Sequence, residues 1–202
     1  MRKKLLCAIL ASVMALSFTA CGGNGDKGNS NGESATQTAT EAKPAIESSA
    51  ALLNSVWEKV DEANKFPVMG GDFDNMVDGE AGIASITNVE NLTATLHITE
   101  DSVALVDEVG TLIHAMNTNT FTAAAYHLKD SANAETLANS LKDSISTTQW
   151  MCGFPDTLII YTVNDEYVVA AFGNKDAIAS FKTNLEAVYA ENATLNVEEA
   201  LV

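Results

Sequence analysis

The last third of the chain carries an apolar pattern that constrains its fold class. Thr157 to Val163 is a run of Leu, Ile, Tyr and Val typical of a buried strand, and Tyr167 to Phe172 is a second such run. The Asn164-Asp165-Glu166 segment between them has the composition of a tight turn, so the two runs predict a β-hairpin. After Gly173-Asn174, apolar residues recur at helical spacing from Ile178 to Tyr189, which predicts a closing helix.

The same strand–turn–helix order occurs once before in the chain. Phe121 to Lys129 is strand-like, and Ser131 is a suitable N-cap for a helix with Leu137, Leu141 and Ile145 on one face. The resulting order β-α-β-β-α predicts an α+β fold. We expect a two-layer sandwich in which a small, mostly antiparallel sheet has its helices packed on one face.

A helix precedes this core in the sequence. Apolar residues recur at helical spacing from Ile46 through Asn64, and Pro44 suits the helix entrance. Phe66-Pro67 and Gly70-Gly71 then break the pattern. The sequence therefore predicts an N-terminal helix that ends before residue 66.

Two further segments are less clear. Leu92 to Ile98 predicts a short helix, whereas Val103 to Ile113 fits either a helix or, from Val106, a strand with a bulge at Gly110. From Asn192 to Val202 we expect a loose acidic tail with a short helical end.

The N-terminus has the order of a secretory signal. Arg2, Lys3 and Lys4 precede an apolar stretch that begins at Leu5, and the stretch ends at Phe18 before small residues. About fourteen apolar residues are too few for a transmembrane helix, which needs roughly twenty. The sequence predicts a signal peptide over residues 1–20 that is cleaved before Cys21.

The cleavage region Phe18-Thr19-Ala20-Cys21 resembles the lipobox of bacterial lipoproteins, with Phe18 in a place that usually holds Leu. Small Thr19 and Ala20 let an extended backbone fit a peptidase cleft. The resemblance implies a diacylglycerol on the Cys21 sulfur, and two acyl chains hold a protein on a membrane essentially permanently. The alternative is an ordinary signal peptide cut near Ala20, with Cys21 incidental.

Residues 21–45 are expected to form a flexible tether. From residue 22 to 45 there is no aromatic residue and no Val, Ile or Leu, so nothing offsets the entropy of ordering. Such a chain has an r.m.s. span of about 25–30 Å. Residues 46–202 are then expected to form a single globular α+β domain.

Charge limits the classes of partner. Loss of Arg2, Lys3 and Lys4 with the signal leaves eight basic residues against 27 acidic ones, a net charge of about −19. Such a surface repels phosphate backbones and anionic headgroups, so we expect no nucleic-acid partner. Once Cys7 has left with the signal and Cys21 is acylated, a lone thiol at Cys152 cannot build a disulfide framework.

Cys152 is the only candidate nucleophile with a thiol. A catalytic cysteine needs a base, usually a histidine with an orienting partner. His97, His114 and His127 lie in no recognisable motif, although a spatial pairing of Cys152 with His127 stays open. We interpret Cys152 as a half-buried thiol and predict no catalytic residues.

Four acids in a short stretch are candidate calcium ligands: Asp72, Asp74, Asp78 and Glu80. An EF-hand loop needs glycine at position 6 and an acid at position 12. A loop beginning at Asp72 has Val77 at position 6, and one beginning at Asp74 has Ser85 at position 12. We predict a solvated turn here, with no metal and no cofactor.

The order of elements over residues 86–189 resembles a family of uncharacterised lipoproteins of Gram-positive anaerobes, a domain of unknown function. The shared features are acidic Glu100-Asp101, Met116-Asn117 before a strand that ends in Lys129-Asp130, the hairpin around Asn164 to Val168, and Phe181 in the closing helix. The resemblance implies an envelope location and carries over no catalytic residue.

These observations predict a lipoprotein on the extracytoplasmic face of the cell membrane, anchored through Cys21. The anchor, the tether and the lack of a catalytic motif favour a non-enzymatic module that binds a protein or a cell-wall component. The alternative is an envelope hydrolase or thiol enzyme that uses Cys152 with a histidine.

Overall fold

The fold is that of a computed structural model, which describes Lys43, residues 45–151 and residues 153–201. Its strands are β1 (Val68–Gly70), β2 (Val77–Asp78), β3 (Gly82–Ala84), β4 (Val106–His114), β5 (Phe121–Leu128), β6 (Thr157–Val163), β7 (Tyr167–Gly173) and β8 (Ala193–Ala200). Its α-helices are α1 (Ser49–Trp57), α2 (Val89–Leu96), α3 (Glu100–Val103), α4 (Ala134–Ser146) and α5 (Lys175–Tyr189). Single 3₁₀ turns cover Glu62–Asn64, Thr118–Thr120, Ser131–Asn133 and Ala190–Asn192.

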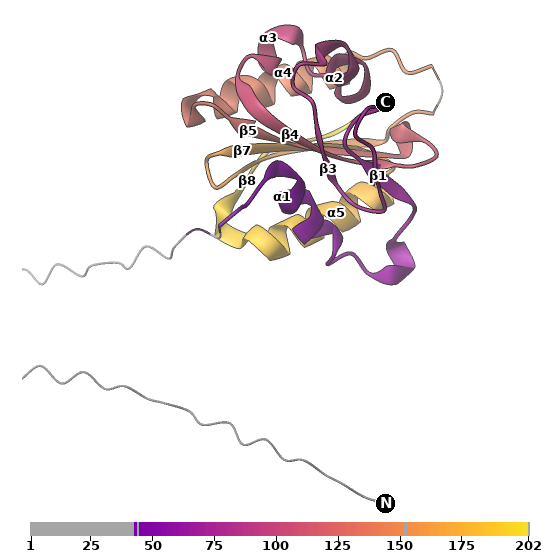
Figure 1. The fold of residues 1–202 in the computed structure, drawn as a ribbon. Coiled ribbons are helices and arrows are strands. Elements are labelled where there is room, and N and C mark those ends of the chain that lie inside the picture. Colours follow the sequence, from indigo (N-terminus) through magenta and orange to yellow (C-terminus); the bar gives the residue numbers. More distant parts are fainter. Residues whose placement is uncertain (1–42, 44, 152, 202) are drawn as a thin grey trace, which may run out of the picture. The chain divides into compact units, whose positions relative to one another are not determined.

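The strands form one antiparallel sheet, which Figure 1 shows between two groups of helices. Their order is β2-β1-β4-β5-β7-β6-β8, and β3 pairs with β4 beside β1. At the centre, β5 and β7 pair from Phe121↔Gly173 to His127↔Tyr167. The α+β class, the antiparallel sheet and the preceding helix α1 are confirmed.

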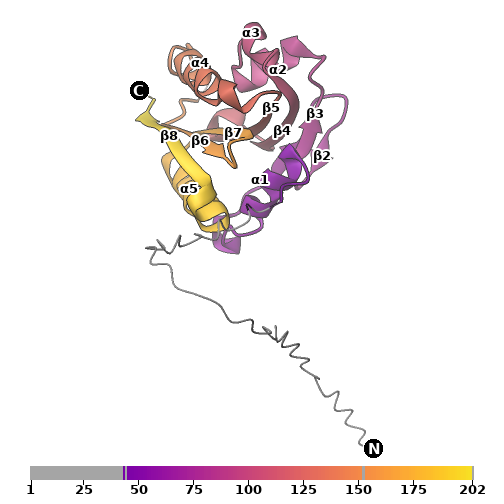
Figure 2. The same cartoon turned by 90° about the vertical axis from the view of Figure 1, so that its left-hand side faces the viewer.

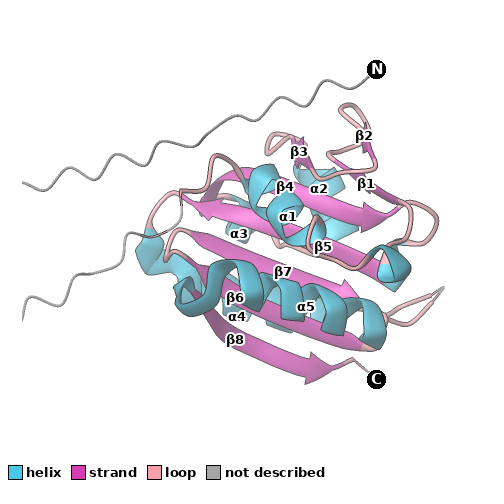
Figure 3. Cartoon of the chain, turned by 90° about the horizontal axis from the view of Figure 1, so that it is seen from below, coloured by secondary structure: helices cyan, strands magenta, loops and turns pink. Residues whose placement is uncertain are grey.

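Helices cover both faces of the sheet, which differs from the expected packing on one face. Helices α1 and α5 lie on one face, and α2, α3 and α4 lie on the other (Figures 2 and 3). The reason is that every residue of β7 is buried, as are all residues of β5 except His127. Strands that are apolar on both sides need cover on both sides. The sheet is therefore the middle of three layers and, with eight strands, is larger than expected.

Each face has its own hydrophobic core. Under α1 and α5, Leu53, Phe121 and Phe181 are almost completely buried, and the Phe121 and Phe181 rings meet edge to face at 5.5 Å. Under α2, α3 and α4, Leu96 and Leu141 pack on the opposite side of the same strands.

The β6–β7 hairpin confirms the turn chemistry expected from the sequence. Asn164 and Asp165 both have positive φ, 55° and 62°. This is the signature of a type I′ turn, which matches the twist of paired strands and favours Asn and Asp.

The ambiguous segment before β5 divides into three elements. Leu92 to Ile98 is largely helical, as predicted, because α2 ends at Leu96 and His97 closes it with a φ of 57°. Residues 103–113 contain the end of α3 and then β4. Gly110 is not the bulge, since the register shift lies between Val106 and Glu108. A Cβ on Gly110 would lie 2.5 Å from the Ser49 carbonyl carbon, so glycine lets α1 approach the sheet.

The C-terminal segment is a strand and not the expected loose tail. Strand β8 pairs with β6 from Thr157↔Ala200 to Val163↔Ala193. Its adjacent acids point to opposite faces: Glu198 pairs with Lys182 of α5 at 2.5 Å, and Glu199 pairs with Lys142 of α4 at 3.7 Å. The expectation was wrong because these ion pairs lie between elements distant in sequence, and the acids alone suggested a solvated tail.

The three-layer packing predicts that replacement by alanine strongly lowers the free energy of unfolding at one phenylalanine and hardly changes it at another. Phe181→Ala opens a cavity in a core where the side chain is 1% exposed, so we expect the free energy of unfolding to fall by about 3–5 kcal/mol. The matched control is Phe154→Ala, 74% exposed in a loop, for which we expect a change within about 0.5 kcal/mol. Urea unfolding followed by circular dichroism measures both; equal effects would contradict the packing of α5 on the sheet.

Candidate functional site

Three loops lie near one another beside the sheet. In chain order, they comprise residues 71–76, residues 115–120, and residues 147–151 with 153–156. The second and third lie at the end at which β4 and β7 finish and β5 and β6 begin, and the first follows β1, which starts beside His114 at that end and runs away from it. The side chain of Asn119 donates a hydrogen bond to the Gly153 carbonyl at 3.0 Å, which joins the second loop to the third. Thr118 lines a pocket together with Phe73 and Met76, which joins the second loop to the first.

These loops carry most of the large apolar side chains that the described part of the chain exposes. Five of the seven such residues lie there: Phe73 (79% exposed), Met76 (54%), Met116 (85%), Met151 (92%) and Phe154 (74%). The other two are Ile83 in β3 and Leu195 in β8. We call the five residues and the pocket between their loops the apolar end.

The carboxylate of Asp72 holds the first loop in place. Its Oδ1 accepts hydrogen bonds from the backbone N–H groups of Asp74 (3.0 Å) and Asn75 (2.9 Å), and its Oδ2 accepts one from Ser85 (2.6 Å). Asp72 is only 7% exposed. These donors, that of Ser85 foremost, hold the pKa of the carboxyl below its usual 3.8, although burial acts in the opposite direction.

The backbone before Asp72 also requires glycine. Gly71 has a φ of +79°, and a Cβ there would lie 2.0 Å from the Asn75 carbonyl oxygen. No other residue fits both the conformation and the space. The loop therefore folds tightly on itself, and the Phe73 side chain is left outside this turn.

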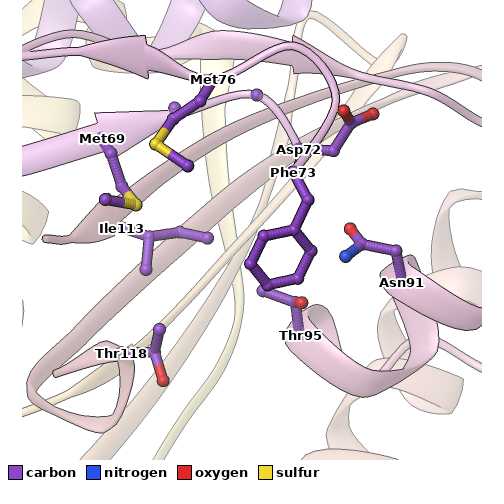
Figure 4. Close-up of a pocket in the computed structure, with 10 residues that line it drawn as sticks. Met69, Asp72, Phe73, Met76, Asn91, Thr95, Ile113 and Thr118 are labelled. Carbon is purple, nitrogen blue, oxygen red and sulfur yellow. The ribbon is translucent and has the colours of Figure 1, made fainter.

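A pocket of about 120 Å³ lies between this loop, α2 and the end of β4. Its floor includes Met69 and Ile113, which are directly paired across β1 and β4. Asn91 and Thr95 of α2 line another side, one helical turn apart. Figure 4 shows the Phe73 ring between these two groups of side chains.

Aromatic rings hold the start of the third loop. The Trp150 ring lies 4.8 Å from the His97 ring, edge to face, and 5.5 Å from the Phe172 ring. Thr148 Oγ1 lies 3.3 Å from His97 Nδ1. Burial lowers the pKa of His97, so its ring is neutral at pH 7 and packs as an aromatic group. Trp150 therefore positions the loop from which Met151 and Phe154 project.

The second loop is ordered by His114. Its Nδ1 accepts hydrogen bonds from the backbone N–H groups of Met116 (3.1 Å) and Asn117 (3.2 Å), and its ring stacks on Phe66 at 5.0 Å. The third histidine, His127, lies at the other end of β5, where its Nδ1 is 2.5 Å from Asp107 Oδ1. The three histidines thus have separate structural partners.

The remaining candidates divide into two groups. Phe18, Thr19, Ala20, Cys21 and Cys152 lie outside the described residues. Of the acidic stretch, Asp72 closes a loop, whereas Asp74, Asp78 and Glu80 are exposed.

Within the described ranges, no three His, Cys, Asp or Glu side chains gather closely enough to hold a metal ion. None of the helices described is both long and apolar enough to cross a membrane.

The apolar end was not predicted from the sequence. Phe73, Met76, Met116 and Phe154 belong to no apolar repeat in the sequence, and a single exposed apolar residue is unremarkable. The available signal was their position in segments without helical or strand periodicity. Only the sheet topology brings the three segments together.

Comparison with models of protein families, with curated proteins and with solved structures gives no match for this chain. The resemblance to lipoproteins of Gram-positive anaerobes stays a prediction.

The role of Asp72 predicts a pH-dependent loss of stability. Its pKa is lowered in the folded state, so its stabilisation is present above about pH 3.8, the ordinary value, and is lost as the pH falls through the folded value. We expect Asp72→Asn to lower the free energy of unfolding by about 1–3 kcal/mol at pH 7, because a buried donor loses its acceptor.

The matched control is Asp74→Asn, an exposed acid in the same loop, which should have little effect. Thermal unfolding between pH 2.5 and 7 provides the measurement. A difference between wild type and Asp72→Asn that persists undiminished at pH 2.5 would contradict the role assigned to the carboxylate.

Proposed function

We propose that this protein is a non-enzymatic binding module on the extracytoplasmic face of the cell membrane, anchored by a diacylglycerol on Cys21. It binds a protein or a cell-wall component through the apolar end. The signal-like order of residues 1–21 supports the anchor. The apolar end supports the binding role.

The observation that carries the proposal is the concentration of Phe73, Met76, Met116, Met151 and Phe154 on three adjoining loops. These side chains add nothing to either core, because more than half of each is exposed. Contiguous exposed apolar surface in a soluble domain marks an interaction site. Loops positioned by a rigid sheet are also where binding residues usually lie.

The place at which the chain enters the domain supports an outward-facing site. Lys43 forms an ion pair with Asp165 at 2.6 Å and donates a hydrogen bond to the Asn164 carbonyl at 2.9 Å. These residues form the β6–β7 turn, at the opposite end of the sheet from the apolar end. The seven residues of β6 separate the two ends by roughly 20 Å. Lys43, at the N-terminal start of the described residues, thus lies at a different end of the domain from the loops that carry Met116, Met151 and Phe154.

Replacement of Cys21 tests the anchor. Two acyl chains give essentially permanent membrane attachment, so we expect the wild-type protein in the membrane fraction and the Cys21→Ser protein in the soluble or secreted fraction. Cys152→Ser is the matched control and should remain with the membrane. Mass spectrometry of the native protein should show a diacylated N-terminal cysteine; an unmodified N-terminus would refute the anchor.

A further inference from the structure

We infer, on the basis of the function proposed above, that the pocket of the apolar end binds a leucine-sized side chain of a cationic amphipathic peptide segment. The partner is thus a protein that presents apolar residues beside lysine or arginine. Three properties of the apolar end support this assignment: the size of the pocket, its methionines and the charge around it.

The pocket has the size and lining for one apolar side chain. A cavity of about 150 Å³ lined by apolar residues accepts benzene, so the 120 Å³ here suits a leucine or methionine side chain. Met69, Ile113 and Phe73 supply apolar contacts on several sides. The Asp72 carboxylate borders the same space, but its oxygens already accept backbone hydrogen bonds.

All methionines of the described residues belong to this end of the domain. Met69 and Met76 line the pocket, and Met116 and Met151 project from the neighbouring loops. Methionine is unbranched and polarizable, so it adapts to apolar partners of different shapes. A surface of this kind suits a helical segment with apolar residues at i, i+3, i+4 and i+7.

The charge around the pocket selects a cationic partner. Between Lys65 and Lys129 the chain contains no lysine or arginine, and every pocket residue lies in this interval. The same interval contains nine acids, of which Asp107 and Glu108 lie at the start of β4, away from the pocket; the other seven are Asp72, Asp74, Asp78, Glu80, Glu90, Glu100 and Asp101. Asp74 and Glu90 are exposed and adjoin pocket residues in sequence. Exposed acids beside an apolar pocket, with no lysine or arginine in the same stretch of chain, attract basic segments and repel acidic ones.

The same charges favour a peptide over a lipid surface. Anionic headgroups are repelled by a domain of this charge. A membrane surface is therefore the less suitable occupant and becomes an outcome of the test.

The test uses the protein with Cys21→Ser, so that it carries no lipid, and a fluorescent 14-residue peptide of Leu and Lys with leucine at helical spacing. Fluorescence anisotropy should show saturable binding that weakens as salt is added. Phe73→Ser and Met76→Ser should each weaken binding roughly tenfold or more, as for residues at the centre of an interface. Leu195→Ser, an exposed apolar residue on β8, is the matched control and should leave binding unchanged.

Two further peptides separate the possible failures. If the analogous Leu/Ser peptide binds in a Phe73-dependent way and the Leu/Lys peptide does not, the apolar end is a binding site but the partner is not cationic. If Leu/Lys, Leu/Ser and Leu/Glu peptides all fail to bind in a Phe73-dependent way, the binding role of the apolar end fails as well. Phe73-dependent binding to phosphatidylcholine vesicles, without peptide binding, would assign the surface to a membrane and overturn the inference.

Discussion

All residues of β7 and all of β5 except His127 are buried, so neither face of the central sheet can be exposed to water. This constraint places α1 and α5 on one face and α2, α3 and α4 on the other. The helices cover the apolar faces of the central strands, and five of the seven exposed large apolar side chains of the described residues project from the three loops. The structural core and the exposed apolar surface are therefore separate parts of the molecule, which is why the latter is free to serve a partner.

The loops of the apolar end are held by polar and aromatic contacts. Asp72 fixes the first loop through backbone N–H donors, His114 orders the second through its Nδ1, and Trp150 secures the third against His97. Such contacts preorganise the loops while leaving the side chain of Phe73 exposed. A preorganised surface loses less conformational entropy on binding than a mobile one. This combination of fixed backbone and adaptable methionine side chains suits the recognition of varied peptides.

Local patterns in the sequence sufficed for β5, α4, the β6–β7 hairpin and α5, because their hydrophobic period and the turn residues Asn164 and Asp165 are unambiguous. They failed for β8, whose Glu198 and Glu199 are paired by lysines of α5 and α4, on opposite faces of the sheet. The second helical layer was missed although the nearly continuous apolar runs of β5 and β7 are typical of strands covered on both faces. The candidate site was missed because the loops of Phe73 and Phe154 are distant in sequence, and only the sheet topology brings them to the same part of the domain.

The central claim is that the apolar end is the binding surface, and methyl NMR on protein labelled at the methionine and leucine methyl groups tests it most directly. The probes Met69, Met76, Met116 and Met151 all lie at that end. On titration with the Leu/Lys peptide, these methyl resonances should shift together, while the leucine methyls of Leu195 on β8 stay in place. Unchanged methionine resonances under conditions where the peptide binds would contradict the account.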